Sequence, residues 1–332
     1  MSRYLVTGAT GFLGSHLVTQ LRDSGHDVVA LCRKEEPGLS AAGVDVRLGD
    51  VLDAASVREA ADGCEGLFHC AGRVSRKRED AGALYRIHVE GTKITLDASR
   101  DAGVKRAVIA STSGVVAVTA GPDEVRDETA ETPIGIIAAW PYYRSKLYAE
   151  RAALDRSGPS FEVLSVNPSL LLGPGDLKGS STGDVASFLE QKLPVVPAGG
   201  LSFVDARDAA AGMFLAMARG RAGERYLLGA ANMTVEGFFA RLSRISSVPA
   251  PKLRAPRSIA LAKAGAHLLE LAKSYLPVEL PLDPVSAEMG QHFWYVDATK
   301  AQQELGWSPR DPLETLTDTI EDLRARGVVW PR

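Results

Sequence analysis

The sequence lacks the features that mark several broad classes of protein. It contains only three cysteines, Cys32, Cys64 and Cys70, with no CxxC pair, which argues against a disulfide framework and a thiolate zinc site. No secretory leader precedes the first predicted strand, and the most apolar stretch, 256–277, is interrupted by charged residues and too polar to span a bilayer. We therefore expect a cytoplasmic protein without a transmembrane segment.

A strong net charge is also absent. The chain has 38 basic and 41 acidic residues, for a formal net charge of -3. A balance this close to neutral provides no broad field that would attract nucleic acid or an anionic membrane. The sequence predicts no metal site, favours a small-molecule substrate as the main partner, and leaves a homodimer open.

What the chain does contain is an alternation of short β-branched runs and longer helical patterns. Its 332 residues correspond to about two domains, and a hydrophobic content of 45% allows sizeable cores. The alternation is typical of βαβ units, whose right-handed crossovers place helices on both faces of a parallel sheet. We therefore predict an α/β fold with a doubly wound parallel sheet. The strands predicted in the first half are 3–6, 27–32, 45–48, 66–70, 106–111 and 161–166.

The segment Thr7–Gly14 follows the first predicted strand directly and precedes an amphipathic helix. Its glycines, Gly8, Gly11 and Gly14, are spaced three residues apart. The first makes the tight turn, the second lets backbone amides approach a pyrophosphate, and the third allows close packing of helix against strand. The strand before and the helix after supply the context that this motif requires. We predict that a dinucleotide binds to Gly8, Thr10, Gly11, Phe12, Leu13 and Gly14.

The end of the second predicted strand indicates which dinucleotide is bound. An acidic residue there would accept hydrogen bonds from the ribose hydroxyls of NAD, whereas a cation accommodates the 2′-phosphate of NADP. This chain has no acid at that place and continues with Arg33 and Lys34, and an arginine fork suits phosphate geometry. The sequence favours NADP(H), with NAD(H) as the alternative. The alternative interpretation is that Arg33 and Lys34 are only a solvated pair of bases with no role in cofactor binding.

The third and fourth predicted strands end in further candidate contacts. Asp50, followed by Val51, is placed to accept a hydrogen bond from the adenine amino group, unless it only caps the turn. After the fourth strand, small residues such as Ala71 admit the backbone of the cofactor. We interpret His69, at the end of that strand, as a packed histidine rather than a catalytic one.

Tyr142 and Lys146 form the only YxxxK pair in the chain, within a segment, 141–150, that predicts a helix. Residues four apart share one helix face. A phenol has a pKa of about 10, so proton transfer near neutrality requires a lower value, which a neighbouring ammonium provides. The same lysine can hold the nicotinamide ribose. We predict that both residues are catalytic and that both contact the cofactor.

Hydroxyl side chains follow the fifth predicted strand. Ser111, Thr112 and Ser113 lie at the carboxyl edge of the sheet, where the nicotinamide is expected, and we assign Ser111 to the cofactor. A hydroxyl at this edge can donate a hydrogen bond to a substrate carbonyl oxygen and hold it beside the tyrosine while the nicotinamide delivers hydride. The alternative interpretation is an ordinary polar strand end.

Turn-rich segments interrupt the alternation after about Asn167. Glycine, proline and serine are frequent in 169–200, and a strand–helix–strand pattern returns at 201–228. The second domain is therefore predicted to be interleaved with the first. We assign residues 1–168 and 201–230 to the dinucleotide-binding domain, and residues 169–200 and 231–332 to the substrate-binding segments.

Together these motifs resemble the extended short-chain dehydrogenase/reductase family, within the NAD-dependent epimerase/dehydratase superfamily. Later segments agree with it, namely Asn167–Ser169, Phe203–Asp208 and Leu305–Arg310. The chain is most similar to dihydroflavonol-4-reductase-like and 3β-hydroxysteroid-dehydrogenase-like members. The resemblance implies a Rossmann fold with a smaller C-terminal substrate domain. It also implies that Ser113 is the catalytic hydroxyl and that the backbone near Pro168 to Leu170 contacts the nicotinamide carboxamide.

The chain departs from the family at two places. Members often have asparagine in the motif Asn-Val-x-Gly-Thr where this chain has His88. We expect a packing or solvated role for His88, with a retained hydrogen bond or a place in a proton relay as the alternative. The segment Ser111–Val115 lacks the acids that sugar-nucleotide dehydratases of the family carry, which argues against dehydration.

Three weaker signals have structural interpretations. The basic cluster in 73–78 is interpreted as a solvated loop rather than a site for an acidic substrate. Arg207 and Asp208 are predicted to pair with each other and to order the helix that follows. The segment 258–276 predicts an apolar helix that packs as a pocket wall or lid, with membrane-surface contact as the alternative.

The sequence thus predicts an NADP(H)-dependent oxidoreductase that interconverts a carbonyl and a secondary alcohol on a small, apolar or aromatic substrate. Ser113 would orient the carbonyl, Tyr142 would donate the proton, and Lys146 would lower the pKa of the tyrosine. The alternative enzyme is an NAD-dependent nucleotide-sugar epimerase, against which Arg33 argues. The alternative of another class is a non-catalytic dinucleotide-binding redox sensor, which the complete catalytic set disfavours.

Overall fold

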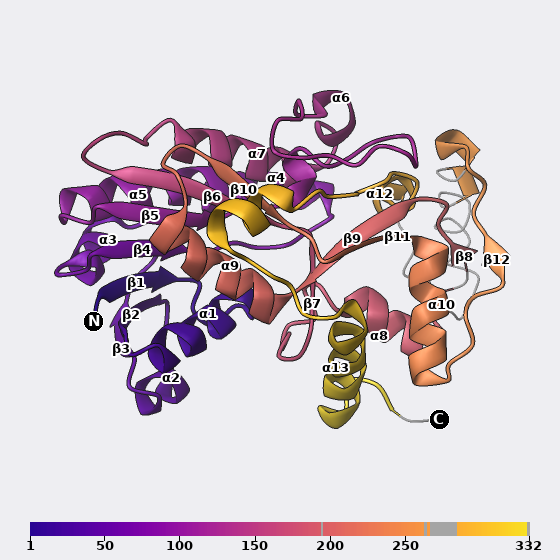
Figure 1. The fold of residues 1–332 in the computed structure, drawn as a ribbon, viewed down its shortest axis with the longest axis horizontal. Coiled ribbons are helices and arrows are strands. Elements are labelled where there is room, and N and C mark those ends of the chain that lie inside the picture. Colours follow the sequence, from indigo (N-terminus) through magenta and orange to yellow (C-terminus); the bar gives the residue numbers. More distant parts are fainter. Residues whose placement is uncertain (194, 262–263, 266–283, 331–332) are drawn as a thin grey trace.

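A seven-stranded parallel sheet organises the larger part of the protein (Figure 1). The structure is a computed structural model that describes residues 1–193, 195–261, 264–265 and 284–330. The strand order is β10-β6-β5-β4-β1-β2-β3, so the order reverses between β1 and β4. In open α/β sheets, ligands bind outside the carboxyl ends of the strands at such a reversal. The strands are β1 (Arg3–Thr7), β2 (Asp27–Cys32), β3 (Asp45–Leu48), β4 (Gly66–His69), β5 (Arg106–Ala110), β6 (Glu162–Pro168) and β10 (Arg225–Leu228).

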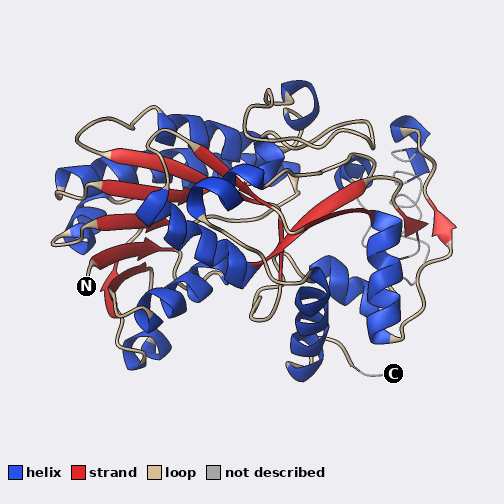
Figure 2. Cartoon of the chain, viewed as in Figure 1, coloured by secondary structure: helices blue, strands red, loops and turns tan. Residues whose placement is uncertain are grey.

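Helices cover both faces of this sheet (Figure 2). α1 and α9 pack together on one face, and α3, α5 and α7 pack on the other. Because successive strand residues point to opposite faces, Val6 belongs to the core under α1 and α9 whereas Leu5 belongs to the opposite core. The helices are α1 (Phe12–Asp23), α2 (Pro37–Ala41), α3 (Ala54–Ala61), α4 (Ala81–Tyr85), α5 (Gly91–Asp101), α6 (Ile134–Ile137), α7 (Pro141–Leu154) and α9 (Ala206–Arg219).

A second lobe is built around a three-stranded sheet in the order β11-β9-β7. β7 runs parallel to β9 and β11 antiparallel to it. α8, α10 and α13 share one hydrophobic core with this sheet (Figure 1). The remaining elements are β7 (Leu170–Leu172), β8 (Val195–Val196), β9 (Gly200–Asp205), β11 (Ala231–Thr234), β12 (Leu253–Arg254), α8 (Gly183–Leu189), α10 (Val235–Ser246), α12 (Pro284–Met289) and α13 (Pro312–Ala325).

The predicted doubly wound α/β fold is confirmed, and the two lobes exchange segments in both directions. β9 pairs in the small sheet although it opens the segment 201–230, while Trp307, from the later part of the chain, packs in the core under α1 and α9. The domain boundaries themselves stay a prediction. Most of the predicted helix 258–276 lies outside the described residues. Within those residues, no helix is long and apolar enough to cross a membrane.

Candidate active site

The glycine loop between β1 and α1 has the geometry that a pyrophosphate site requires. Gly8 has a φ of +72°, and a Cβ there would lie 2.6 Å from the backbone nitrogen of Ala71. A Cβ on Gly14 would overlap the carbonyl oxygen of Gly8, so both positions require glycine. No side chain caps α1 at Gly11, so the first amides of the helix are left for a ligand, and the helix N-terminus favours an anion. The loop fits a dinucleotide.

The two bases predicted to select the cofactor follow β2 as expected. Arg33 is exposed and has no ion-pair or hydrogen-bond partner within the described part of the chain. The Nζ of Lys34 lies 3.9 Å from a carboxylate oxygen of Glu36, with the lysine side chain 81% exposed. An exposed pair at this distance contributes little to stability. Neither base is therefore required by the fold.

Asp50 and Val51 lie in the turn after β3. The Asp50 carboxylate accepts a hydrogen bond from the backbone amide of Leu52 at 2.9 Å, which confirms the turn-capping role. The contact with adenine stays a prediction. Val51 packs against the start of α5, because a Cβ on Gly91 would lie 3.1 Å from its Cγ2.

His69 ends β4 as a packed strand histidine, as predicted. Its Nδ1 lies 2.7 Å from the hydroxyl of Thr7, and its Nε2 lies 3.0 Å from the hydroxyl of Thr92. The side chain is 3% exposed, and burial lowers its pKa to about 3, so the imidazole is neutral. Ala71, two residues later, directs its amide toward the Thr7 hydroxyl at 3.4 Å. β4 is thereby joined to the start of the glycine loop.

The three predicted catalytic residues come from two elements that pack together, α7 and the 3-10 turn Ser113–Val115. Pro141 occupies the first turn of α7, so Tyr142 lies at the start of the helix and Lys146 one turn later. The Nζ of Lys146 donates a hydrogen bond to the carbonyl oxygen of Ala110, at the end of β5, at 2.5 Å. Ser113 is buried in the turn that follows the same strand.

Burial controls the protonation of this pair. It lowers the pKa of Lys146 to about 8, although the charge of Glu150 opposes the change. Burial also raises the pKa of Tyr142, with Tyr143 as the second cause. The predicted lowering of the tyrosine pKa by Lys146 is therefore not seen in this arrangement. The physical reason is that the ammonium donates to Ala110 and the phenol is desolvated.

Two serine hydroxyls at the carboxyl edge of the sheet are buried without a partner in the described residues. They belong to Ser111, 7% exposed, and Ser169, 8% exposed. A buried polar group without a hydrogen bond is costly, which makes these hydroxyls candidates for contacts with a bound ligand. Ser111 is among the predicted cofactor residues. The backbone of Ser169 lies within the predicted contact 168–170, but its side-chain hydroxyl was not predicted as a contact.

His88 is buried in a π-helical turn, Arg86–Glu90, and is hydrogen bonded on both ring nitrogens. Its Nε2 accepts a hydrogen bond from the Arg73 amide at 3.1 Å, so Nδ1 carries the proton and donates to the Ser145 hydroxyl at 2.8 Å. That hydroxyl donates to the carbonyl oxygen of Tyr142 at 2.7 Å, and the His88 ring lies edge-on to the Tyr142 ring at 5.7 Å. The packing role is confirmed, and the ring is hydrogen bonded rather than solvated.

The basic cluster in 73–78 is largely exposed, as predicted, but it also reaches the second lobe. Arg73 pairs with Asp80 within the loop at 3.1 Å. Arg76 pairs with Asp184 of α8 at 3.1 Å and donates to the Ser286 hydroxyl of α12 at 3.3 Å. The loop after β4 is therefore connected to α8 and α12.

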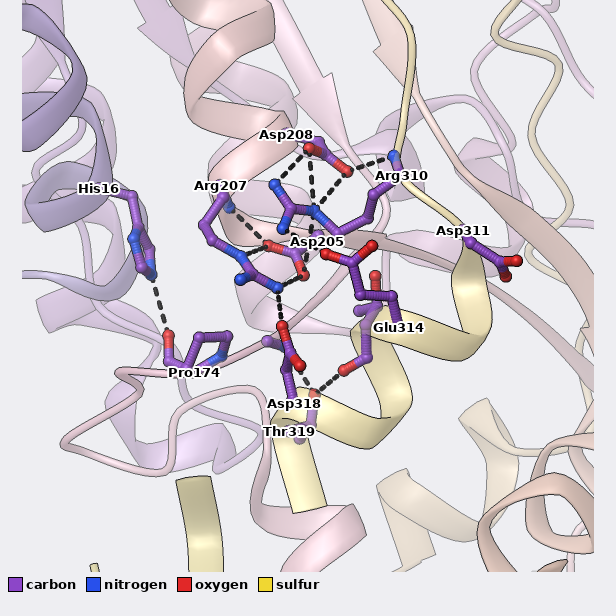
Figure 3. Close-up of polar contacts among 12 residues, drawn as sticks. His16, Pro174, Asp205, Arg207, Asp208, Arg310, Asp311, Glu314, Asp318 and Thr319 are labelled. Carbon is purple, nitrogen blue, oxygen red and sulfur yellow. Dashed lines mark hydrogen bonds and ion pairs between the residues drawn. The ribbon is translucent and has the colours of Figure 1, made fainter. Parts of the chain in front are cut away.

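The prediction that Arg207 and Asp208 pair with each other is wrong (Figure 3). Arg207 binds the buried Asp205 at 2.7 Å and Asp318 of α13 at 2.5 Å. Asp208 instead accepts hydrogen bonds from the backbone amide and the guanidinium of Arg310, at 2.8 and 2.9 Å. Adjacent helix residues point in different directions, so each finds a partner in a different segment. These ion pairs connect the start of α9 to α13 and to the segment just before it.

The sequence profile of the NAD-dependent epimerase/dehydratase family matches residues 4–229. A putative dihydroflavonol 4-reductase of Synechocystis sp. is 35% identical over 98% of this chain and 96% of its own length. A 4-hydroxy-2-methyl-3-oxo-4-farnesyl-3,4-dihydroquinoline-1-oxide ketoreductase of Stigmatella aurantiaca is 30% identical over 93% of this chain and 92% of its own.

Solved structures resemble the whole chain as well. A nucleoside-diphosphate-sugar epimerase from Pseudomonas aeruginosa superposes with a TM-score of 0.80 at 25% identity. The alignment covers 99% of each chain. The arrangement of both lobes is therefore shared with proteins whose names include reductases and an epimerase.

Proposed function

Since the chain belongs to the NAD-dependent epimerase/dehydratase family and, within it, to the extended short-chain dehydrogenases/reductases, we propose that it is an NADP(H)-dependent oxidoreductase. It interconverts a carbonyl group and a secondary alcohol on a small, apolar or aromatic substrate. The observation that carries the proposal is the packing of α7, with Tyr142 and Lys146, against the turn that holds Ser113. That assembly lies at the carboxyl edge of a sheet whose first loop fits a dinucleotide.

The residues that would hold the cofactor follow from the same geometry. The amides at the start of α1 would bind the pyrophosphate, Arg33 the 2′-phosphate, and the free hydroxyls of Ser111 and Ser169 would face the nicotinamide half. Lys146 would hold the ribose hydroxyls. When bound, the nicotinamide supplies or accepts the hydride.

Each catalytic residue has a role that its surroundings support. Ser113 donates a hydrogen bond to the substrate carbonyl oxygen and fixes it beside Tyr142. Burial keeps the Tyr142 phenol protonated at neutral pH, which suits a proton donor in the direction of reduction. The ammonium of Lys146 stabilises the phenolate that remains after the proton has left, and His88 holds α7 through the Ser145 hydroxyl.

Aromatic side chains around Tyr142 support an apolar or aromatic substrate. The ring of Tyr143 lies 5.0 Å from that of Tyr142, and the ring of Trp294 lies 4.9 Å from that of Tyr143. Two whole-length relatives carry reductase names. An apolar wall with few polar groups is typical of sites for small organic ligands.

The epimerase alternative is supported by the likeness to the epimerase from Pseudomonas aeruginosa and opposed by the exposed, unpaired Arg33. The nucleotide retained by the purified protein separates the two. Tightly held NAD would favour the epimerase, and weakly held NADPH the reductase. Arg33→Asp should abolish a preference for NADPH over NADH while leaving turnover with NADH in place, and an unchanged preference would remove Arg33 from the phosphate site.

The catalytic proposal is tested with NADPH and a panel of ketones. Tyr142→Phe should abolish NADPH oxidation while cofactor binding is retained. Tyr148→Phe is the matched control, because Tyr148 lies on the same helix with its side chain exposed and should leave turnover unchanged. Equal turnover by the wild type and the Tyr142 variant would refute the mechanism. Binding without turnover on any carbonyl substrate would favour the redox sensor.

A further inference from the structure

Tyr143, the residue after the proposed proton donor, lies directly against the backbone beside Ser113. A Cβ on Gly114 would overlap the Tyr143 ring and would lie 3.0 Å from the ring of Trp294. Glycine at this position therefore lets two aromatic rings reach the turn that carries the proposed catalytic hydroxyl. The Tyr143 ring packs against the hydrophobic cluster that contains Val115 and Trp140, but the proposed catalytic mechanism does not use its hydroxyl.

Tyr143 packs against two tryptophans, Trp140 and Trp294, and we call these three residues the aromatic wall. Its ring lies 4.9 Å from that of Trp294, which stacks on Trp140 at 5.5 Å with an interplanar angle of 23°. The Trp294 indole donates to the carbonyl oxygen of Met289 at 3.2 Å, which fixes the orientation of the wall. The Tyr143 ring also contacts the ring of Tyr142. The two rings are nearly perpendicular, and their centroids lie 5.0 Å apart.

The hydroxyl of Tyr143 is not used by the fold. It makes no hydrogen bond with any residue that the structure describes, and the side chain is only partly buried. Burial raises its pKa to about 12, so the phenol stays protonated; the charges of Arg76 and Asp184 act on it as smaller, opposing effects. A neutral phenol that can donate and accept is thus placed near both Tyr142 and the ion pair that joins the two lobes.

We propose that Tyr143 selects the substrate. Its ring supports a flat apolar or aromatic group attached to the reacting carbonyl, and its hydroxyl hydrogen-bonds a second oxygen of the substrate. A carbonyl held by Ser113 and Tyr142 brings its substituent against the neighbouring ring, because Tyr143 contacts both the turn and Tyr142. A partly buried hydroxyl in an apolar wall gains most from a ligand that satisfies it. This inference rests on the proposed function.

The test compares ketones that differ in one feature at a time. Acetophenone, 2-hydroxyacetophenone and cyclohexyl methyl ketone are reduced with NADPH by the wild type, Tyr143→Phe and Tyr143→Leu. Tyr143→Phe keeps the ring, so it should lower kcat/KM for the hydroxyketone about five- to tenfold and leave that for acetophenone within about twofold. Tyr143→Leu should lower the preference for the aryl over the cyclohexyl ketone about three- to tenfold. Tyr148→Phe again serves as the matched control.

The outcomes separate this inference from the proposed function. If turnover depends on Tyr142 but both Tyr143 variants keep the wild-type substrate ratios, substrate selection by Tyr143 is overturned and the reductase stands. An equal loss on all three ketones also overturns it, since Tyr143 would then act on the reaction and not on selection. If the wild type reduces no ketone of the panel, the proposed function fails and this inference with it. Should the leucine variant not fold, the phenylalanine variant decides.

Discussion

Acidification from pH 7 to pH 5 should destabilise this protein through two buried histidines, His69 and His88. Their side chains are 3% and 2% exposed, and burial lowers the pKa of each from 6.5 to about 3, with Lys146 as a second cause. Below pH 6.5 the unfolded chain therefore binds protons that the folded protein does not. The free energy of unfolding is highest above that pH and falls as the pH drops toward 3.

The size of the effect follows from the same values. One pH unit of proton uptake by a single group corresponds to about 1.4 kcal/mol. At pH 5 each histidine should therefore lower the free energy of unfolding by about 2 kcal/mol, against a total of about 5–15 kcal/mol for a typical domain. Burial raises the pKa of Glu128, so this residue changes stability with pH in the opposite direction. Every variant retains Glu128, so its contribution cancels when variants are compared.

The perturbation is His88→Asn, which introduces the residue that the family resemblance implies at this position. Asparagine cannot take up a proton. It should remove about half of the stability lost between pH 7 and pH 5. Ser145→Ala is the control, because it removes the hydrogen-bond partner of His88 but keeps the imidazole. It should lower the free energy of unfolding at every pH without changing how steeply that free energy depends on pH. Urea unfolding at several pH values, with the midpoint and the m-value followed separately, measures both. If the free energy of unfolding of His88→Asn depends on pH as steeply as that of the wild type, the reasoning is refuted.

Three further predictions follow from the site and its supports. Burial lowers the pKa of Lys146 to about 8, so the side chain loses its charge above that pH. The value of kcat/KM should therefore fall as the pH rises through about 8. A flat profile up to pH 10 would contradict a role for the ammonium. Arg310→Met leaves the carboxylate of Asp208, which is 7% exposed, without its main partner. It should lower the free energy of unfolding, measured in urea, by about 2–4 kcal/mol. A decrease of less than about 1 kcal/mol would show that stability does not depend on this ion pair. Gly14→Ala should abolish NADPH binding in a fluorescence titration, because the added methyl group overlaps the Gly8 carbonyl, and tight binding by this variant would argue against the loop geometry.

The fold was predictable where local signals and tertiary packing agree. β2 and β3 begin and end at the predicted residues. In β2 the reason is an apolar, buried run that a turn precedes. The glycine loop and the helix with Tyr142 and Lys146 were predictable for a similar reason. Spacing within one element determines which side chains share a face.

Contacts between distant segments were not predictable. Arg207 and Asp208 are neighbours in sequence, yet Asp208 pairs with Arg310, and Arg207 reaches Asp318 in addition to the nearby Asp205. Nothing local indicates the two distant pairings. The approach of Trp294 to Tyr143 has the same origin. A single helix gives the direction of a side chain, but only the packing of two lobes decides what it meets.

The buried carboxylate of Asp208 has a consequence for synthesis of the chain on the ribosome. The large sheet has all its strands once β10 ends at Leu228, but Asp208, at the start of α9, finds its partner only when Arg310 has been made. Until then the nascent chain lacks the guanidinium that pairs with this carboxylate. The last segment supplies first this partner and then α13, which belongs to the core of the second lobe. Completion of translation therefore stabilises both halves together.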